Sequence, residues 1–124
     1  GDPSEAFPHF LGGADETGAG AGAGATLNLP LPPGTGWDRW SAALDTALTR
    51  IVAHGVDGLI VSLGVDAYKD DPISFFTLET EDFRRLGARL AKAGLPTVFV
   101  MEGGYAIAEI GLNVAAVLRA FEDA

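Results

Sequence analysis

The sequence predicts an α/β protein in which a parallel sheet is covered by helices on both faces. Two short runs, DGLIVSLGV (57–65) and PTVFVM (96–101), are apolar at almost every position, as in strands that are buried on both faces. Segments with helical periodicity precede, separate and follow these runs. Because a helix lies between the two strands, we expect the strands to run parallel and to be joined by a right-handed crossover.

The first 36 residues carry no periodic pattern and are expected to be loop-rich. The run GADETGAGAGAGA contains glycine and alanine without periodicity, and TLNLPLPP places Leu27, Leu29 and Leu31 on one face of a short extended segment. Pro30 would confine such a segment to the edge of a sheet. Since long irregular segments in compact domains are often functional, we assign 1–36 to a loop-rich active-site segment and 37–124 to the α/β core.

Three helices are expected in this core. Residues 37–54 bear apolar side chains at helical spacing and are followed by Gly55, a residue suited to a left-handed helix end. Thr80 is predicted to cap a second helix, whose first turn contains Glu81 and Asp82. A third helix occupies the C-terminal region. The side chains predicted to face inward are Trp40, Leu44, Ala47, Leu48, Ile51, Phe83, Leu86, Leu90, Ala91, Ile110, Val114, Val117, Leu118 and Phe121.

Polar residues follow both apolar runs, GVD (64–66) after the first and EGGY (102–105) after the second. Ligands of open parallel α/β sheets bind at the carboxyl ends of the strands, so Asp66 and Tyr105 are expected to face one pocket. A carboxylate is a hard oxygen ligand for a divalent metal, and a phenol can donate to a developing oxyanion. The pair suggests metal-assisted attack of water on a carbonyl, with Gly103 and Gly104 permitting the sharp turn that aims the ring.

These residues also have plainer structural interpretations. An aspartate after a strand is commonly a helix cap or a turn residue, and a tyrosine after two glycines is commonly a packed aromatic at a rim. Asp70-Asp71-Pro72 is interpreted as a charged turn shaped by its proline, rather than as paired catalytic carboxylates. His9 and His54 are interpreted as structural or peripheral.

The composition excludes several classes of protein. The 124 residues suit one domain, and the absence of cysteine excludes a disulfide scaffold, a cysteine-based zinc site and a thiol nucleophile. The net charge of −9 argues against a nucleic-acid partner and suits a cationic small molecule, although an ordinary solvated surface explains it as well. No apolar run is long enough to span a bilayer and no signal peptide opens the chain, so we expect a cytoplasmic protein without a membrane partner.

Several motifs together resemble the histone deacetylase superfamily, and more closely its acetylpolyamine amidohydrolase branch. The matching stretches are SLGVDAYKDDPISFF (62–76), VFVMEGGYAIAEIG (98–111), the opening GDPSEAFPHFLGGADETGAGAG (1–22) and NLPLPPGTGW (28–37). The resemblance implies an arginase/deacetylase-like fold. It also implies that residues 1–124 are a C-terminal fragment, about the last third of a deacetylase-like catalytic domain.

The resemblance further implies a reaction and roles for individual residues. Asp66 would be a ligand of the catalytic metal, usually Zn²⁺ with Fe²⁺ or Co²⁺ as alternatives, and Tyr105 would hydrogen-bond the scissile carbonyl and its oxyanion. The substrate channel would be lined by Phe7, Ile73, Gly103 and Gly104. The reaction implied is hydrolysis of a small cationic acetylated amine, such as an acetylpolyamine, or of acetyl-lysine, with release of acetate. A homo-oligomer of the intact protein is left open.

Two motifs that the family's site requires, an Asp-x-His pair and an adjacent His-His pair, do not occur in these residues. One carboxylate cannot hold a catalytic metal, because three protein ligands are the usual minimum. The chain alone is therefore predicted neither to bind zinc tightly nor to turn over substrate, so that activity belongs to the intact parent protein. The alternative is a non-catalytic relative that acts as a binding or interaction module. The presence of both Asp66 and Tyr105 argues against it.

Overall fold

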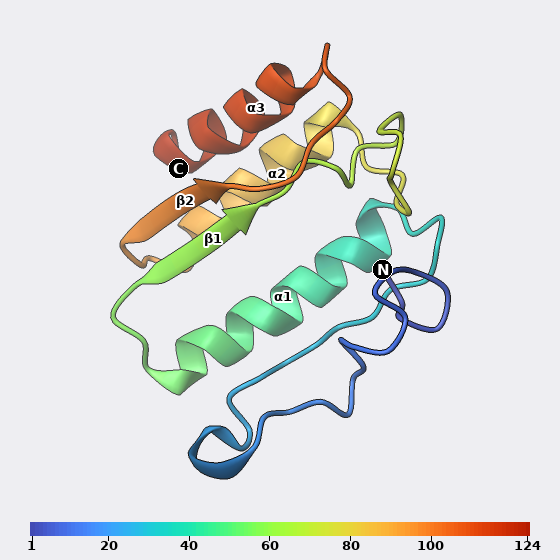
Figure 1. The fold of residues 1–124 in the computed structure, drawn as a ribbon. Coiled ribbons are helices and arrows are strands. Elements are labelled where there is room, and N and C mark those ends of the chain that lie inside the picture. The colour runs from blue at the N-terminus through green and yellow to red at the C-terminus, as the bar shows by residue number, and fades with distance from the viewer.

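A computed structural model describes all 124 residues, and it consists of three α-helices packed against a two-stranded parallel sheet (Figure 1). A single turn of 3₁₀-helix, η1, occupies Gly20–Gly22. The regular elements that follow are α1 (Trp37–His54), β1 (Leu59–Leu63), α2 (Thr80–Ala91), β2 (Thr97–Met101) and α3 (Ile110–Glu122). No helix combines the length and the apolar character needed to cross a membrane.

The two strands run parallel, as predicted. Leu59 lies opposite Thr97 at the start of the pair and Leu63 lies opposite Met101 at its end. Because the strands begin and end in register, the chain leaves both of them at the same edge of the sheet (Figure 1). This register positions the segments that carry the predicted site residues.

The helices pack on one face of this sheet. Val61 and Phe99 point from that face toward a buried cluster to which all three helices contribute. The fully buried members of the cluster are Leu63, Val65, Leu78, Phe83, Leu86, Leu90 and Val117. On the opposite face Ile60 is 74% exposed and Val98 is 59% exposed, so burial alternates along β1 and along β2 as far as Val100. The prediction of helices on both faces therefore holds for one face of the sheet in this chain.

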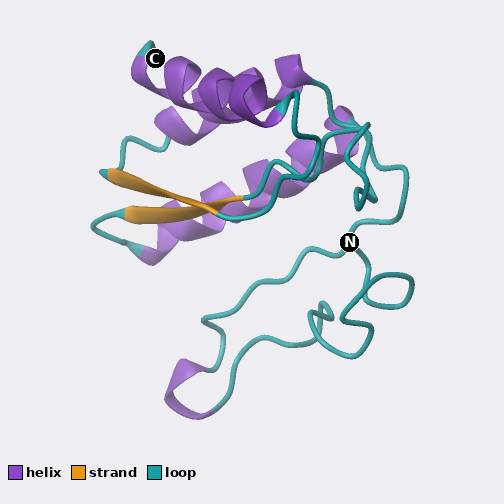
Figure 2. Cartoon of the chain, turned by 45° about the horizontal axis from the view of Figure 1, so that its top comes forward, coloured by secondary structure: helices purple, strands orange, loops and turns teal.

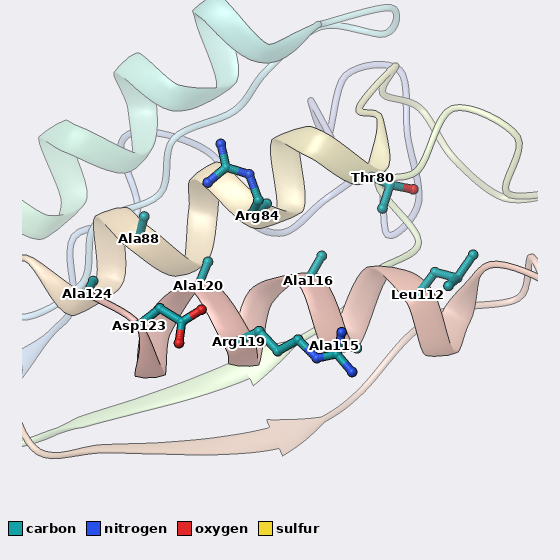
Figure 3. A pocket seen from close by; sticks show the side chains of 10 residues that line it. All are labelled: Thr80, Arg84, Ala88, Leu112, Ala115, Ala116, Arg119, Ala120, Asp123 and Ala124. Carbon is teal, nitrogen blue, oxygen red and sulfur yellow. The ribbon is translucent and has the colours of Figure 1, made fainter.

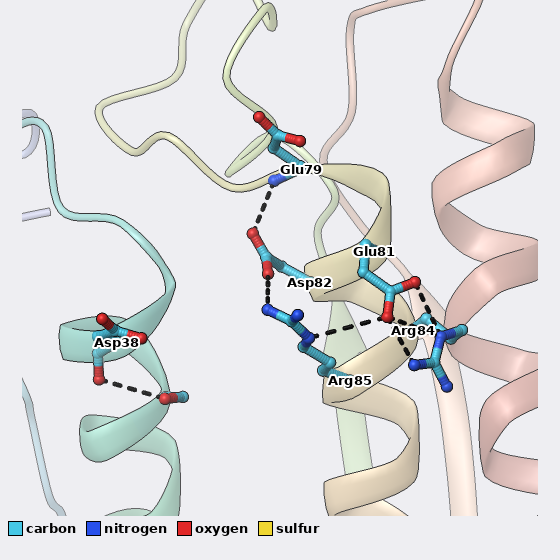
Figure 4. Close-up of polar contacts among 7 residues, drawn as sticks. Asp38, Glu79, Glu81, Asp82, Arg84 and Arg85 are labelled. Atoms are coloured by element: carbon cyan, nitrogen blue, oxygen red, sulfur yellow. Dashed lines mark hydrogen bonds and ion pairs between the residues drawn. The ribbon is translucent and has the colours of Figure 1, made fainter.

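The start of α2 differs from the sequence prediction. Glu79, not Thr80, is the capping residue, and the Asp82 carboxylate accepts the Glu79 N–H at 3.0 Å (Figure 4). The Thr80 hydroxyl instead donates to the side-chain oxygen of Asn113 in α3, at 2.7 Å. Asn113 is 1% exposed, and a buried polar group requires such a partner. Thr80 was predicted from local sequence alone, and its long-range partner explains the error.

Helices α2 and α3 approach each other closely. A Cβ atom at Gly87 would lie 2.1 Å from the carbonyl oxygen of Val117, so only glycine fits at this point of contact. Val117 is fully buried, whereas Leu118, which the helical pattern predicted to face inward, is 37% exposed. The close backbone contact turns α3 so that Leu118 lies at the margin of the buried face.

Helix α1 is joined to α2 through aromatic and charged side chains. Trp37 and Trp40 stack with ring centroids 6.1 Å apart, and the guanidinium of Arg89 lies 5.1 Å from the Trp37 ring. Arg89 also pairs with Asp45 at 3.0 Å. The contribution of such partly exposed pairs is modest, so the tryptophan packing against the core is the main attachment of α1.

Residues 1–36 form a long loop that extends away from the helices and the sheet (Figure 2). The extended segment predicted for Leu27, Leu29 and Leu31 does not pair with a strand, which corrects that prediction. The loop is attached by the Arg50 guanidinium, which donates to the carbonyl of Gly24, and by the Gly34 N–H, which donates to the carbonyl of Phe75 at 2.7 Å. The carbonyl of Thr35 also accepts the Thr77 N–H at 3.1 Å, and Ala6 and Thr35 are the only buried residues in this part of the chain.

Candidate functional site at the carboxyl ends of the strands

The segments that follow β1 and β2 remain paired beyond the strands. The Glu102 N–H donates to the carbonyl of Leu63 at 3.0 Å, and the Val65 N–H donates to the carbonyl of Gly103 at 2.7 Å. The parallel pairing therefore carries GVD and EGGY side by side out of the sheet, as the sequence predicted.

The carboxylate of Asp66 lies in a space that two glycines leave open. A Cβ atom at Gly103 would lie 2.3 Å from Oδ2 of Asp66, and a Cβ atom at Gly64 would lie 2.8 Å from its Oδ1. A side chain at either position would displace the carboxylate. The sequence analysis predicted that Gly103 permits a turn, and the structure adds that it makes room for Asp66.

The charges around Asp66 are predominantly negative. Burial raises the pKa of the half-buried Asp66 carboxyl above its usual range, and the neighbouring carboxylates of Asp71 and Glu102 raise it further. Glu102 is close, since a Cβ atom at Gly64 would lie 3.2 Å from its Oε2. A cation would relieve both the repulsion and the burial of charge, so the chemistry of this donor set favours a hard cation.

Asp71 joins the two strand-end segments, a role that the sequence analysis missed. Its buried carboxylate accepts the N–H of Tyr105 at 2.7 Å and the N–H of Ala106 at 3.1 Å through Oδ2. Its Oδ1 accepts the N–H of Ile73 at 3.0 Å. Asp71 does sit in a turn, as predicted, because its carbonyl accepts the Ser74 N–H. The proline that follows it signalled the turn, but no local pattern indicates a partner 34 positions away.

The side chain of Tyr105 is 53% exposed, and its hydroxyl makes no hydrogen bond within the chain. Ile73, predicted to line a channel, is also 53% exposed, and its backbone meets that of Tyr105 at the Asp71 carboxylate. The structure thus brings the backbones of Asp66, Ile73, Gly103 and Tyr105 into one region.

Phe7 lies elsewhere, in the N-terminal loop, and its side chain is 86% exposed. The beginning of this loop lies near the segment after β1, because a Cβ atom at Gly1 would lie 3.9 Å from the Phe75 ring. The Phe7 side chain packs against little of the chain, so its place in a substrate channel stays a prediction.

The chain does not form a complete metal site by itself. It contains no group of three or more histidine, cysteine, aspartate or glutamate side chains arranged to hold a metal ion. His9 and His54 are both exposed, in agreement with a peripheral role. Asp66 fits a single oxygen-ligand position, and further ligands are needed to hold a catalytic cation.

A hollow on the surface lies away from this site. A groove of about 630 Å³ runs between α2 and α3, lined largely by small alanine side chains with Arg84, Arg119 and Asp123 at its margin (Figure 3). It includes no residue from the strand ends. The candidate site is therefore defined by its converging backbone segments and by Asp66, not by an enclosed cavity.

At one edge of the parallel sheet, the Asp66 carboxylate lies beside a turn that carries Tyr105. This arrangement is typical of the class of α/β proteins whose ligands bind at the carboxyl ends of the strands. Residues 1–121 match the histone deacetylase domain family. The chain therefore belongs to the histone deacetylase family, which confirms the resemblance seen in its motifs.

Individual relatives agree with the acetylpolyamine amidohydrolase branch. Acetylpolyamine amidohydrolase 1 of Pseudomonas aeruginosa is 56% identical over 100% of this chain, and the acetylpolyamine amidohydrolase of Mycoplana ramosa is 56% identical over 96% of it. The crystal structure of an acetylpolyamine aminohydrolase from Burkholderia pseudomallei is 40% identical and matches with a TM-score of 0.94, covering 98% of this chain and 35% of that one. The fold class is confirmed by this likeness. The chain spans about 36% of the length of the first of these relatives.

Proposed function

We propose that the parent protein, of which this chain forms a part, is a metal-dependent amidohydrolase that removes acetyl groups from N-acetylated amines. The observation that carries the proposal is the pairing of GVD with EGGY at one edge of the sheet, in a chain 56% identical to an acetylpolyamine amidohydrolase. The relatives' names support an acetylated amine as the class of substrate. The net charge of −9 supports a cationic amine in a weaker way.

Asp66 would hold the metal through its carboxylate. Its position over the backbone of Gly103 and its acidic surroundings support this role. When bound, a divalent cation supplies Lewis acidity toward the amide carbonyl and toward water. Zn²⁺ is the cation we propose, with Fe²⁺ and Co²⁺ as alternatives, and the remaining ligands would come from other parts of the parent protein.

Tyr105 would donate a hydrogen bond from its phenolic hydroxyl to the carbonyl oxygen of the substrate as negative charge develops there. Its hydroxyl is free of other partners and its ring is half-exposed, which leaves the group available to a ligand. Ile73 and Phe7 would contact the apolar stem of the amine. The group that moves the proton from water to the leaving amine would come from other parts of the parent protein, because this chain contains no adjacent His-His pair.

The proposal is tested in the purified full-length protein with acetylputrescine and an acetyl-lysine peptide as substrates. Asp66→Asn should lower metal content and turnover together. Tyr105→Phe should leave metal content unchanged and lower kcat by roughly two to three powers of ten, as expected for the loss of one oxyanion donor. Metal analysis and steady-state kinetics measure these effects.

The same experiment separates the enzyme from a non-catalytic binding module. A protein that binds metal but releases no acetate from either substrate would be such a module. A Phe variant with normal turnover would remove Tyr105 from the mechanism. Residues 1–124 expressed alone should release no acetate, and measurable deacetylation by that product would contradict the role that we assign to the rest of the protein.

A further inference from the structure

We propose that Asp71 is a positioning residue for Tyr105, and that it ties the placement of the phenol to that of the channel residue Ile73. This inference rests on the proposed function. Asp71 does not touch the reacting atoms, and it acts through the backbone of Tyr105, whose side chain would touch them. Three features of the turn between β2 and α3 support this role of Asp71.

The first feature is that Asp71 is the only anchor of the tyrosine-bearing segment. Between residues 104 and 108, the two hydrogen bonds to Asp71 are the only ones that reach another part of the chain. The Ala106 carbonyl accepts N–H groups only from the start of α3, and the Tyr105 side chain makes no hydrogen bond. Without the carboxylate, the hydrogen bond from the Val65 N–H to the Gly103 carbonyl would be the last polar contact of this segment with the segment after β1.

The second feature is that the two glycines before Tyr105 do not fix their own backbone conformation. Gly104 has φ of 152°, a conformation that other residues rarely adopt, and a Cβ atom there would lie 2.6 Å from Cγ2 of Val65. Gly103 must also lack a side chain, because Asp66 occupies the space. Because Gly103 and Gly104 have no side chains, the segment can pack closely, but its backbone keeps conformational freedom. Its geometry therefore depends on the hydrogen bonds to Asp71 that follow.

The third feature is that the anchor requires a carboxylate. All three partners of the Asp71 side chain are N–H donors, two on Oδ2 and one on Oδ1. An amide of the same shape must turn its NH₂ group either toward the Ile73 N–H or toward the N–H groups of Tyr105 and Ala106. At least one donor is then left unpaired against another donor, and the neutral amide oxygen holds the others less strongly than a carboxylate does. The Asp71 side chain is buried, so water cannot readily take its place.

These contacts link two residues that the proposed site uses. The Ile73 N–H and the Tyr105 N–H bind the two oxygens of one carboxyl group, whose atoms are rigidly connected. A shift of the carboxylate therefore moves the channel wall and the phenol together. The expected result of losing it is a misplaced phenol, with the metal ligand Asp66 still in its glycine cradle.

The test is a double-mutant cycle in the full-length protein, with Asp71→Asn made alone and in the Tyr105→Phe background. Alone, Asp71→Asn should lower kcat, expressed per bound metal ion, roughly ten- to a hundredfold, the range expected for a small displacement of a catalytic group, with KM changed much less. In the Tyr105→Phe background the same substitution should have little further effect, because the phenol that it positions is absent. Asp70→Asn is the matched control, since it removes the same charge from the adjacent, exposed position and should leave kcat unchanged.

A readout independent of turnover accompanies the kinetics. Hydrogen–deuterium exchange of the Tyr105 and Ala106 amides should be faster in Asp71→Asn than in the wild type or in Asp70→Asn. Equal losses of kcat in the two backgrounds, or unchanged exchange of these amides, would each overturn the proposal. Should Asp71→Asn not fold, Asp71→Glu keeps the charge but displaces the carboxyl group, and the same dependence on Tyr105 is expected of it.

The outcomes distinguish this inference from the proposed function. A wild-type protein without deacetylase activity would overturn the proposed function, and a Tyr105→Phe variant with normal kcat would remove Tyr105 from the mechanism. In either case the exchange measurement would still report whether Asp71 anchors the turn. An active wild type whose Tyr105→Phe variant is impaired, combined with an additive Asp71→Asn effect, would sink this inference alone.

Discussion

Two irregular regions of the chain, both assigned to the active site from sequence, differ sharply in how they are held. The strand-end segments, 64–71 and 102–106, continue the sheet pairing and meet at the buried Asp71 carboxylate. The N-terminal segment, 1–36, exposes large apolar side chains, with Phe7 86% and Phe10 92% exposed. Both regions are rich in glycine and neither is regular, so the difference does not lie in composition.

The difference lies in the neighbours available to each region within this chain. The strand-end segments emerge from a paired sheet and find a buried acceptor for their N–H groups. The N-terminal segment finds only scattered contacts, such as the Arg50 hydrogen bond to Gly24. Substitutions in the strand-end segments should therefore have large effects on activity, because they disturb a fixed backbone geometry. Substitutions in the N-terminal segment should have smaller effects, because they remove only the contacts of one side chain.

The largest effect is expected from Gly103→Ala. The added methyl group would lie 2.3 Å from Oδ2 of Asp66 and would force the carboxylate out of its cradle. In the full-length protein we expect kcat/KM to fall by roughly a hundredfold or more, with a matching loss of bound metal. Kinetics and metal analysis measure both.

The matched control for this substitution is Gly111→Ala, at a glycine in α3 around which nothing lies within 4 Å of an added Cβ. It should keep both metal and activity. Full activity in Gly103→Ala would show that the Asp66 carboxylate does not need its position over Gly103.

A smaller effect is expected for the two channel residues. Ile73→Ala should raise KM roughly tenfold, because about 1.4 kcal/mol of apolar contact with the substrate stem would be lost. Phe7→Ala should raise KM by less, roughly a few-fold, since its segment is weakly held. Steady-state kinetics on acetylputrescine measure both changes, and kcat and metal content should hold in each variant. If Phe7→Ala had the larger effect, the N-terminal segment must be ordered by parts of the protein beyond this chain.

The smallest effect concerns stability and pH in metal-free protein. Burial raises the pKa of Asp66 in the folded state above its usual value of 3.8, so the folded state holds its proton more tightly than the unfolded state. The stability that Asp66 contributes is therefore complete below pH 3.8 and is lost as pH rises through the higher folded pKa. With metal removed, Asp66→Asn should be slightly more stable than wild type at pH 7. Its advantage should disappear in acid.

Urea unfolding of both proteins across this pH range, in the presence of a chelator, measures the effect. A wild type that is more stable than Asp66→Asn at pH 7 without metal would contradict the burial argument. Added Zn²⁺ should reverse the order if Asp66 is a ligand, because only the carboxylate gains from the cation.

Much of the fold followed from the sequence because its signals are local or repeat along the chain. The apolar runs predicted parallel strands, and the rule that ligands bind at the carboxyl ends of such strands predicted Asp66 and Tyr105 at one edge of the sheet. Gly55 ends α1 in the left-handed conformation, with φ of 78°, as predicted. These features depend on neighbouring residues, which the sequence displays directly.

The missed features depend on partners distant in the chain. Thr80 has the chemistry of a cap, but its hydroxyl is used by Asn113, 33 positions later. Asp71 has the sequence setting of a turn residue, and its decisive contacts are with the backbone after β2. The open face of the sheet was missed for a different reason. Strands that are apolar on both faces indicate that both faces are buried in the complete domain, and this chain is only a part of such a domain.

That open face has a practical consequence for anyone who produces these residues alone. Ile60 and Val98 would be presented to water beside strand edges that no neighbour covers, since the sheet contains only β1 and β2. Unpaired strand edges beside exposed apolar side chains favour pairing with strands of other copies of the chain. A recombinant product limited to 124 residues should therefore self-associate, and co-expression with the remainder of the polypeptide should keep it dispersed.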